Sequence, residues 1–553
     1  MTPDGSSRLR HAAAAFTSNA RNQNLRRAQL SFLGAWTAEW AFTVALGIVA
    51  YRDGGAAAVG LVGLLRMVPS AVLAPMLSPL VDRGRRERVL VVVSTLRGLA
   101  TAAAAVVVTL DASVVLVYAA AVLSTIAATL YRPAHSALLP SLCRTGHELA
   151  SANVVRGLLD SVATLVGPLV ATVLLGFAGV DLVFAVAALA SFWSAALMVG
   201  LRYDAPPRPA ATRPNLVAEA LDGVRAVARH RGLSLVLGLA AAQALTRGAL
   251  TVLSVVVAIE LLGTGEPGVG ALMTAVGVGA VLGSLAASFL VGTGRLGAWF
   301  ALGVALWGLP LALVGAFPQE AAALVLVAFI GVGNALIDVA GFTLIGRMAA
   351  DEVLGRVFGV LESVVTVFIG LGAMSASLLI GWFDVRTALV VTGLLCPVLA
   401  IASWRSLRGL DRSVHMLDDD VALLQGVPML APLPLPAVER LARGLRTVTV
   451  ESGAAVFRQG DEGDDYFVVG SGEVDVVGDG QLVTTLGSGE GFGEIALLRR
   501  TPRTATALAR SDLTLRALAS ERFLPVVLGY TPSTRQAEED MAGLLERFDP
   551  ESA

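Results

Sequence analysis

Apolar residues gather in long runs between Gln29 and Trp404. A run of roughly 20 apolar residues, wound as an α-helix, is long enough to cross the hydrocarbon core of a bilayer. We interpret about twelve runs as transmembrane helices, near residues 29–50, 56–81, 88–110, 113–132, 151–176, 181–201, 233–261, 267–292, 297–316, 321–346, 355–381 and 385–404. The pattern therefore predicts an all-α membrane bundle. The polar tail 1–28 lacks the apolar core of a signal peptide, so no cleaved signal is expected.

The pattern changes after Trp404. From residue 446 onward, short apolar stretches are separated by glycines, which is typical of strands joined by tight turns. The predicted strands are 447–451, 455–458, 466–477, 482–486, 504–509 and 513–519. Helical spacing recurs at 437–444, 521–530 and 533–548. We expect a β-roll with flanking helices over 421–553, joined to the bundle by a linker at 405–420.

The segments between the apolar runs alternate in charge. One set is rich in arginine: Arg83, Arg85, Arg86, Arg88, Arg144, Arg202, Arg208, Arg213, Arg225, Arg229, Arg231, Arg295 and Arg347. The opposite set carries only Arg52 and Arg386. Arginine-rich loops stay on the cytosolic side of a membrane. Both chain ends and the β-roll are therefore expected in the cytosol, with the chain in the cytoplasmic membrane.

The apolar region repeats itself. The sequence Gly-Leu-Leu-Asp-Ser-Val at 157–162 corresponds to Gly-Val-Leu-Glu-Ser-Val at 359–364, 202 residues later. Each copy follows an arginine-bearing cytosolic loop and precedes a glycine-rich span. Two six-helix halves, 29–201 and 233–404, joined by a cytosolic loop at 202–232, resemble the major facilitator superfamily. The resemblance implies a secondary transporter whose substrate site lies between the halves.

Shorter motifs indicate a branch of this family. The segment Ser78–Arg86 resembles the family's signature loop after the second span, with Ser78 in place of the usual glycine. Tyr-Arg-Pro-Ala at 131–134, followed by Leu-Leu-Pro at 138–140, looks like the multidrug and siderophore exporters. Gly-Pro at 167–168 resembles the antiporter motif without its later glycines. These motifs imply export.

Several ionisable residues lie within predicted spans, where each costs roughly 2.5–3.5 kcal/mol on insertion scales. They are Glu39, Arg66, Arg97, Asp160, Arg247, Asp338 and Glu362. Glu39 and Arg66 lie deepest, and together with Arg247 and Asp338 they are the candidates for substrate or proton binding. Asp82, Arg83, Asp160 and Glu362 lie nearer the cytosolic side, where the family uses such charges as a conformational latch. Structural ion pairs are the alternative interpretation for all of these residues.

A glycine-rich cassette occupies residues 489–507. The sequence Phe-Gly-Glu-Ile-Ala-Leu-Leu at 492–498, followed after three residues by Pro-Arg-Thr-Ala-Thr at 502–506, resembles the phosphate-binding cassette of cyclic nucleotide-binding domains. The resemblance implies that Glu494 binds the ribose 2′-hydroxyl, that Arg503 and the Ala496 amide bind the cyclic phosphate, and that Gly493 lets the backbone approach. The pocket would comprise Phe492, Gly493, Glu494, Ile495, Ala496, Arg503 and Thr504. A degenerate cassette without ligand and a cupin-like β-roll corner are the alternatives.

Composition excludes several functions. All 41 basic residues are arginine, so the chain lacks the lysine of a P-loop, of a protein kinase and of Schiff-base chemistry. Five scattered histidines and two isolated cysteines offer neither a zinc site nor a disulfide framework. A net charge of −2 argues against nucleic acid as a partner. No enzymatic activity and no metal or cofactor are expected.

The combined prediction is a proton-coupled exporter of a small amphipathic molecule, regulated by cAMP or cGMP at its C-terminal domain, with cAMP favoured. Two alternatives remain open. One is a membrane receptor that senses the nucleotide without transport, and the other is a transporter of the cyclic nucleotide itself. The transported substrate and the oligomeric state do not follow from the sequence.

Overall fold

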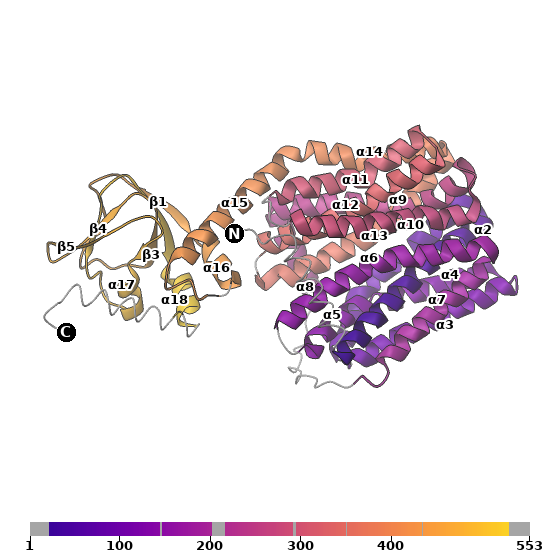
Figure 1. Cartoon of the computed structure of the whole chain (residues 1–553), viewed down its shortest axis with the longest axis horizontal. Helices are drawn as coiled ribbons and strands as arrows, with labels where there is room; N and C mark the ends of the chain where they lie inside the picture. The colour runs from indigo at the N-terminus through magenta and orange to yellow at the C-terminus, as the bar shows by residue number, and fades with distance from the viewer. Residues whose placement is uncertain are drawn as a thin grey trace. The chain divides into compact units, whose positions relative to one another are not determined.

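The computed structural model of the chain describes residues 22–83, 85–143, 146–201, 216–290, 295–349, 351–433, 435–529 and 533. It divides into two compact units, Met1–Leu410 and Asp411–Ala553. The first unit is helical and the second is built on two β-sheets (Figure 1). The predicted architecture, an all-α bundle followed by a β-roll with flanking helices, is confirmed.

The helices of the first unit fall into two halves. Its N-terminal half contains α2 (Gln23–Arg83), α3 (Arg86–Thr109), α4 (Val114–Ala128), α5 (Tyr131–Leu142), α6 (Gly146–Phe177) and α7 (Val180–Met198). Helix α8 (Leu216–Arg229) lies in the predicted inter-half loop. The C-terminal half contains α9 (Arg231–Val256), the π-helical turn η1 (Val257–Leu261), α10 (Gly265–Leu290), α11 (Leu296–Ala316), α12 (Glu320–Met348), α13 (Asp351–Trp382) and α14 (Val385–Ala402).

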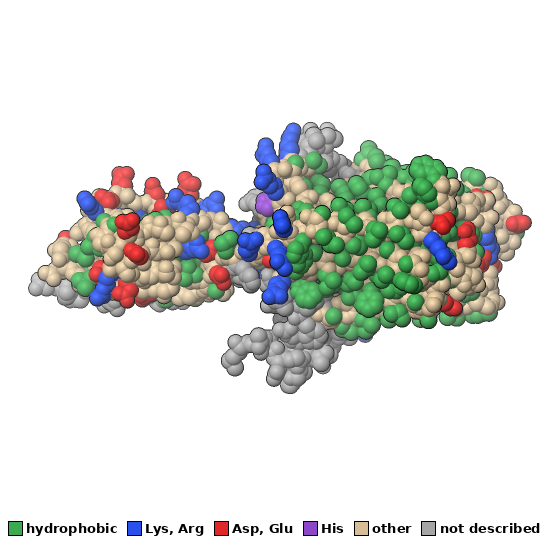
Figure 2. Space-filling model, turned by 90° about the horizontal axis from the view of Figure 1, so that it is seen from above, with side chains coloured by type: hydrophobic (Ala, Val, Ile, Leu, Met, Phe, Trp, Pro, Cys, Tyr) green, Lys and Arg blue, Asp and Glu red, His purple; other side chains and the backbone are tan. Residues whose placement is uncertain are grey.

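Eleven stretches of the described helices are long and apolar enough to cross a membrane. The first of them, Gln23–Ala74 in α2, covers the predicted span 29–50 and most of the span 56–81, and the backbone leaves helical geometry between the two at Gly54 and Gly55. Hydrophobic side chains cover the lateral surface of this unit, whereas charged side chains gather toward its ends (Figure 2). The bundle thus presents an apolar belt of the kind that a bilayer solvates.

Contacts of α2 define the two ends of the bundle. Near its start, Asn22 donates to the Leu142 carbonyl at the end of α5, and Arg27 donates to the Leu197 carbonyl near the end of α7. We call this end the inner end. The kink at Gly54–Gly55 lies at the opposite, outer end. The charge pattern of the sequence predicts that the inner end is cytosolic.

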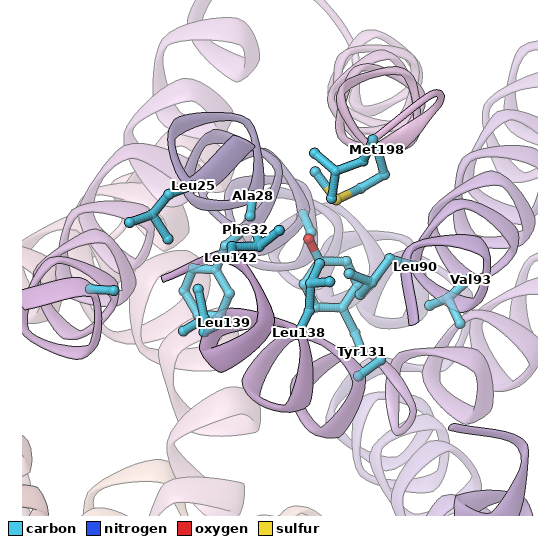
Figure 3. Close-up of a cluster of buried hydrophobic side chains, with 14 of the residues drawn as sticks. Leu25, Ala28, Phe32, Leu90, Val93, Tyr131, Leu138, Leu139, Leu142 and Met198 are labelled. Carbon is cyan, nitrogen blue, oxygen red and sulfur yellow. The ribbon is translucent and has the colours of Figure 1, made fainter. Parts of the chain in front are cut away.

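The packing at the inner end of the N-terminal half is apolar. Figure 3 shows a cluster drawn from four helices there: Leu25, Ala28, Phe32, Leu90, Val93, Tyr131, Leu138, Leu139, Leu142 and Met198. The ring of Phe32 lies close to that of His135, with 4.9 Å between centroids and 40° between the ring planes. His135 is fully buried and its Nε2 bonds to the Ala28 carbonyl, so it serves the core.

Helix α15 (Trp404–Gly426) connects the two units. It runs through the segment predicted as a linker, so that segment is helical. Helix α16 (Leu435–Ala442) follows, and the intervening segment 427–433 forms turns.

The second unit contains two antiparallel four-stranded sheets. One has the strand order β1-β8-β3-β6 and the other β2-β7-β4-β5. The strands are β1 (Arg446–Val450), β2 (Ala455–Phe457), β3 (Asp465–Ser471), β4 (Val474–Gly478), β5 (Gln481–Leu486), β6 (Gly491–Phe492), β7 (Thr506–Ala509) and β8 (Leu513–Ala519). Helix α17 (Glu494–Arg499) follows β6, and α18 (Ser520–Leu528) follows β8.

Two expectations need comment. The predicted strand 466–477 is wrong as a single element, because Gly472 adopts a φ of +93° and divides it into β3 and β4. A side chain with a Cβ rarely adopts that conformation, so glycine permits the turn. The predicted helix 533–548 lies outside the described residues, apart from Ser533.

Candidate functional sites

Arg503 is the central side chain of the candidate nucleotide site. It is only 4% exposed, although a guanidinium normally stays in water. Its Nη1 donates to the Gly493 carbonyl at 2.9 Å, and its Nη2 donates to the Asp465 carbonyl at 2.7 Å. The carbonyls come from the start of α17 and the start of β3, so the fold fixes the guanidinium from two sides.

An aromatic cluster supports the same guanidinium. The Arg503 Cζ lies 4.2 Å from the centroid of the Phe457 ring and 5.8 Å from that of Phe467. Phe492 stacks on Phe467 with 5.4 Å between centroids. A guanidinium over an aromatic face is attracted by the ring quadrupole, more strongly where water is excluded. The cluster therefore offsets part of the cost of burying this charge.

Two glycines leave room for Arg503. A Cβ at Gly463 would lie 2.0 Å from Nε of Arg503, and a Cβ at Gly493 would lie 2.5 Å from Nη1. Gly493 also has a φ of +91°, which residues with a side chain rarely adopt. In the structure the group that lies against Gly493 is the guanidinium of Arg503, and the predicted approach of the Gly493 backbone to a ligand stays a prediction.

The site retains capacity for an anion. Among the described residues, Nε of Arg503 is buried and has no hydrogen-bond acceptor. Burial lowers the pKa of the Arg503 guanidinium, whereas the nearby charges of Asp465 and Glu494 raise it. A buried donor without an acceptor costs about 1–3 kcal/mol. An anionic oxygen placed at Nε would remove that cost.

The residues of the predicted pocket differ in exposure. Phe492, Glu494, Ile495 and Ala496 are buried, at the end of β6 and in the first turn of α17, whereas the Thr504 side chain is exposed. Sequence analysis missed Phe457 and Asp465 as neighbours of Arg503. Their positions in separate strands carry no local signal, and only the sheet pairing brings them to the cassette.

The second candidate site is a charge cluster inside the N-terminal half. Glu39 pairs with two guanidiniums, through Oε1 with Arg66 at 3.0 Å and through Oε2 with Arg97 at 2.5 Å. Arg66 also donates from Nε to the Thr125 hydroxyl at 2.8 Å. Both arginines are buried, and the Glu39 side chain is 17% exposed. One carboxylate thus ties the first three predicted spans together.

A third group of charges faces the region between the halves. Arg132 pairs with Asp160 at 3.3 Å. On the other half, Asp338 accepts a hydrogen bond from the Asn334 amide at 2.9 Å. The charges that act electrostatically on Asp338 come from four other helices of both halves: Arg132, Asp160, Arg247 and Glu362. Asp338 and Glu362 are exposed although they lie in the middle of helices.

Tryptophans of α2 line the same region. The Arg132 guanidinium lies 4.6 Å from the Trp36 ring centroid, and that of Arg247 lies 5.9 Å from Trp40. The second contact joins the two halves. Neither tryptophan was predicted from the sequence, and Arg97 and Arg132 were not among the predicted site residues. The reason is that an apolar span gives no indication of which of its faces meets another helix.

The predicted transport and latch residues therefore lie in two separate places. Glu39 and Arg66 belong to the cluster within one half, whereas Arg247, Asp338, Asp160 and Glu362 belong to the region between the halves. The side chains of Asp82 and Arg83 lie outside the described part of the structure. The roles assigned to all eight residues stay predictions.

Comparison with known proteins identifies both units. Residues 447–530 match the cyclic nucleotide-binding domain family, and residues 30–257 and 235–415 match the Major Facilitator Superfamily. A cAMP-dependent protein kinase regulatory subunit of Schizosaccharomyces pombe is 38% identical over 103 residues, which are 18% of this chain and 25% of that protein. The chain therefore spans only about a quarter of the length of this curated relative.

Solved structures resemble the helical unit. A mutant of the nucleoside transporter NupG superposes with a TM-score of 0.59 at 13% identity, over 70% of this chain and 100% of that one. A POT family transporter in complex with a thioalcohol-conjugated peptide gives a TM-score of 0.57 at 12% identity, over 69% and 96% of the two chains. At these identities the likeness concerns the fold. With two family matches that together cover residues 30–415, the chain belongs to the Major Facilitator Superfamily, and its transporter domain is fused to a C-terminal cyclic nucleotide-binding domain.

Proposed function

We propose that this protein is a proton-coupled exporter of a small amphipathic molecule whose transport cycle is biased by cAMP. The proposal has three parts, which rest on separate observations. They are a path between the two halves, an acidic group that can carry a proton, and a nucleotide pocket connected by one helix to the last span.

The charges between the halves carry the proposal. Asp338 and Glu362 are exposed in the middle of helices, where a lipid-facing charge would be costly. A Cβ added at Gly157 or Gly359 would meet no atom within 4 Å, so open space adjoins the inner parts of α6 and α13. Charges at the interface of two halves are the arrangement by which a rocking transporter binds polar parts of a substrate.

Asp338 is better supported than Glu39 as the residue that carries the proton. Its exposed carboxylate can exchange a proton with water, and it lies among charges of both halves. Glu39 is held by two buried guanidiniums in ion pairs that tie three spans together, and this geometry suits a packing role. We therefore assign proton coupling to Asp338 and a structural role to the cluster of Glu39, Arg66 and Arg97.

Substrate chemistry follows from the same surroundings. Trp36 and Trp40 offer aromatic faces, and the adjacent charged groups have both signs. These groups suit a molecule with an apolar ring system and at least one charge. The motif at 131–140 supports membership of the multidrug and siderophore exporter branch, and Gly-Pro at 167–168 resembles the antiporter motif, so both support outward transport.

The nucleotide pocket supports regulation. The buried Nε of Arg503 can donate to a cyclic phosphate, and Glu494 can accept from a ribose hydroxyl. The Schizosaccharomyces pombe relative is a cAMP-dependent regulatory subunit, which favours cAMP as the ligand. A receptor without transport activity, or a transporter of the nucleotide itself, would use the same pocket, so transport must be measured directly.

The test is uptake and efflux of fluorescent amphipathic dyes in proteoliposomes that contain the full-length protein. We expect dye movement that needs a pH gradient and changes when cAMP is supplied on the side of the C-terminal domain. Asp338→Asn should abolish the dependence on the gradient. If no dye moves under any condition while cAMP still binds, the receptor without transport activity is favoured. Movement of labelled cAMP across the membrane would favour the nucleotide as cargo.

A further inference from the structure

Three consecutive residues of α2, directly before its kink at the outer end of the bundle, make polar contacts that the proposed function does not use. The Tyr51 hydroxyl donates to the Glu260 carboxylate. Arg52 donates from Nε to Oε1 of Glu266 at 2.6 Å and from Nη2 to Oε2 at 2.7 Å. Glu260 and Glu266 belong to η1 and α10 of the C-terminal half. Two neighbouring side chains of one half therefore bind carboxylates of the other.

The third residue anchors this segment to its own half. Asp53 accepts a hydrogen bond from the Tyr118 hydroxyl of α4 at 2.8 Å. The helix kinks directly afterwards, at Gly54 and Gly55. The three polar side chains thus end the first span in a defined position, where Arg52 can present both nitrogens to one carboxylate. This fork geometry is directional, unlike a contact between point charges.

The π-helical turn explains why Glu260 reaches Tyr51. On α2, Trp40, Gly47 and Tyr51 are spaced by seven and four residues and lie on one helical face. Their partners Arg247, Val255 and Glu260 are spaced by eight and five. Hydrogen bonds in a π-helix run from residue i to residue i+5, so residues five apart come onto one face. If regular α-helix continued through Val257–Leu261, the next residue after Val255 on this face would be residue 259 and not Glu260.

Close packing accompanies these contacts. A Cβ at Gly47 would lie 3.1 Å from Val255, and one at Gly60 would lie 2.0 Å from the Ser377 hydroxyl. Gly60 lies on α2 beyond the kink and Ser377 lies on α13, so the halves also touch there. The Ser377 hydroxyl donates to the Ala56 carbonyl at 2.6 Å. The outer parts of the halves are in contact, whereas Gly157 and Gly359, toward the inner end, adjoin open space.

We propose that Tyr51 and Arg52, together with Glu260 and Glu266, form an outer latch that holds the two halves closed at the outer end of the bundle. The latch must break before the site between the halves can open outward. Arg52 therefore sets the balance between the two states of the cycle without contacting the substrate. This inference rests on the proposed transport function, because it requires halves that rock against each other.

The test measures the distance between the outer ends of the halves. Ala112 and Gln319 are exposed, in the connections before α4 and before α12, and each is replaced by a spin-labelled cysteine. The background carries Cys143→Ser and Cys396→Ala, and the full-length protein is placed in lipid nanodiscs. Double electron–electron resonance then gives the populations of the closed and open states without any substrate.

Arg52→Ala and Tyr51→Phe should each add a population at longer distance, with the open-to-closed ratio rising roughly two- to fivefold, as expected for a partly exposed polar pair. The swap of Arg52→Glu with Glu266→Arg should return the ratio toward that of the parent. Arg386→Ala is the matched control, because Arg386 is an exposed arginine at the same end, and it should leave the distances unchanged.

A distance distribution that is the same in the parent and in the Arg52→Ala, Tyr51→Phe double variant would overturn the latch. So would an equal shift in the Arg386→Ala control. Retained cAMP binding in each variant shows that the protein is folded. Failure of the latch with dye transport intact leaves the proposed function standing. A shift in distance without transport of any dye rejects the transport proposal alone.

Discussion

Asp420 on α15 and Arg516 on β8 form an ion pair, with 3.0 Å between Oδ1 and Nε. The Asp420 side chain is 15% exposed, so the pair is partly shielded from water. Arg516 also donates to the Thr447 hydroxyl of β1. The same helix begins at Trp404, directly after α14, the last predicted span. One continuous helix therefore leads from the transporter domain to the sheet of the nucleotide-binding domain.

The end of this helix also shares a hydrophobic cluster with the candidate pocket. Leu424 of α15 and Leu497 of α17 both belong to it, together with Tyr466, which stacks on Phe523 at 4.5 Å. A ligand that moves α17 must therefore disturb the packing around α15. This arrangement gives the proposed regulation a physical route.

The first prediction concerns this route. A typical coupling between two sites changes a state ratio 5- to 150-fold. We expect Asp420→Ala to reduce the effect of cAMP on dye flux by up to about fivefold, the value of a partly exposed ion pair. Calorimetry should give unchanged cAMP affinity. The swap of Asp420→Arg with Arg516→Asp should recover part of the effect. A full cAMP response in Asp420→Ala would exclude the pair from the route.

The second prediction tests the pocket. A charge-assisted hydrogen bond contributes about 1.5–3 kcal/mol, which corresponds to roughly 10- to 150-fold in affinity. Arg503→Ala should weaken cAMP binding by at least that factor in calorimetry of the full-length protein. Arg510→Ala is the control, because Arg510 is an exposed arginine of the same domain that pairs with Glu473. Equal affinity in the two variants would mean that the cassette is degenerate.

The third prediction concerns the base of the nucleotide. The exposed Thr504 hydroxyl follows Arg503 in the chain, and it can accept a hydrogen bond from the 2-amino group that guanine carries and adenine lacks. We expect cAMP to compete better than cGMP, and Thr504→Ala to weaken cGMP alone, by about 2- to 10-fold for one neutral hydrogen bond. A competition titration checks this. A preference of tenfold or more for cGMP would reverse the assignment.

The fourth prediction separates two carboxylates in the membrane. Glu39→Gln leaves the buried guanidiniums of Arg66 and Arg97 without a counter-charge, and breaking a buried pair costs up to about 3–5 kcal/mol. We expect a lower midpoint of thermal unfolding in detergent. Asp338→Asn should unfold like the parent, because its side chain is exposed, and should lose only proton-coupled flux. The opposite result, a stable Glu39→Gln variant without coupling, would return the proton to Glu39.

The sequence by itself determined the class of each domain. Burial against lipid needs about 20 apolar residues in succession, so each span is visible in a contiguous stretch of chain. The cassette is visible for a similar reason. Gly493 and Arg503 are only ten residues apart in the chain, and Arg503 donates a hydrogen bond to the Gly493 carbonyl. Where the contacts that define a domain are local in the chain, the pattern of residues is sufficient to predict the class of that domain.

Only the tertiary structure decided which charges meet. Glu39 could pair with any arginine of the bundle, and helix packing selects Arg66 and Arg97. Arg52 stood out in the sequence only as one of two arginines in the outer connections, and its partner Glu266 lies 214 residues away. The energy of an ion pair depends on a separation of a few ångströms and on the surrounding dielectric. Neither quantity exists before the helices pack, which is why the partners of these charges followed from the fold and not from the sequence.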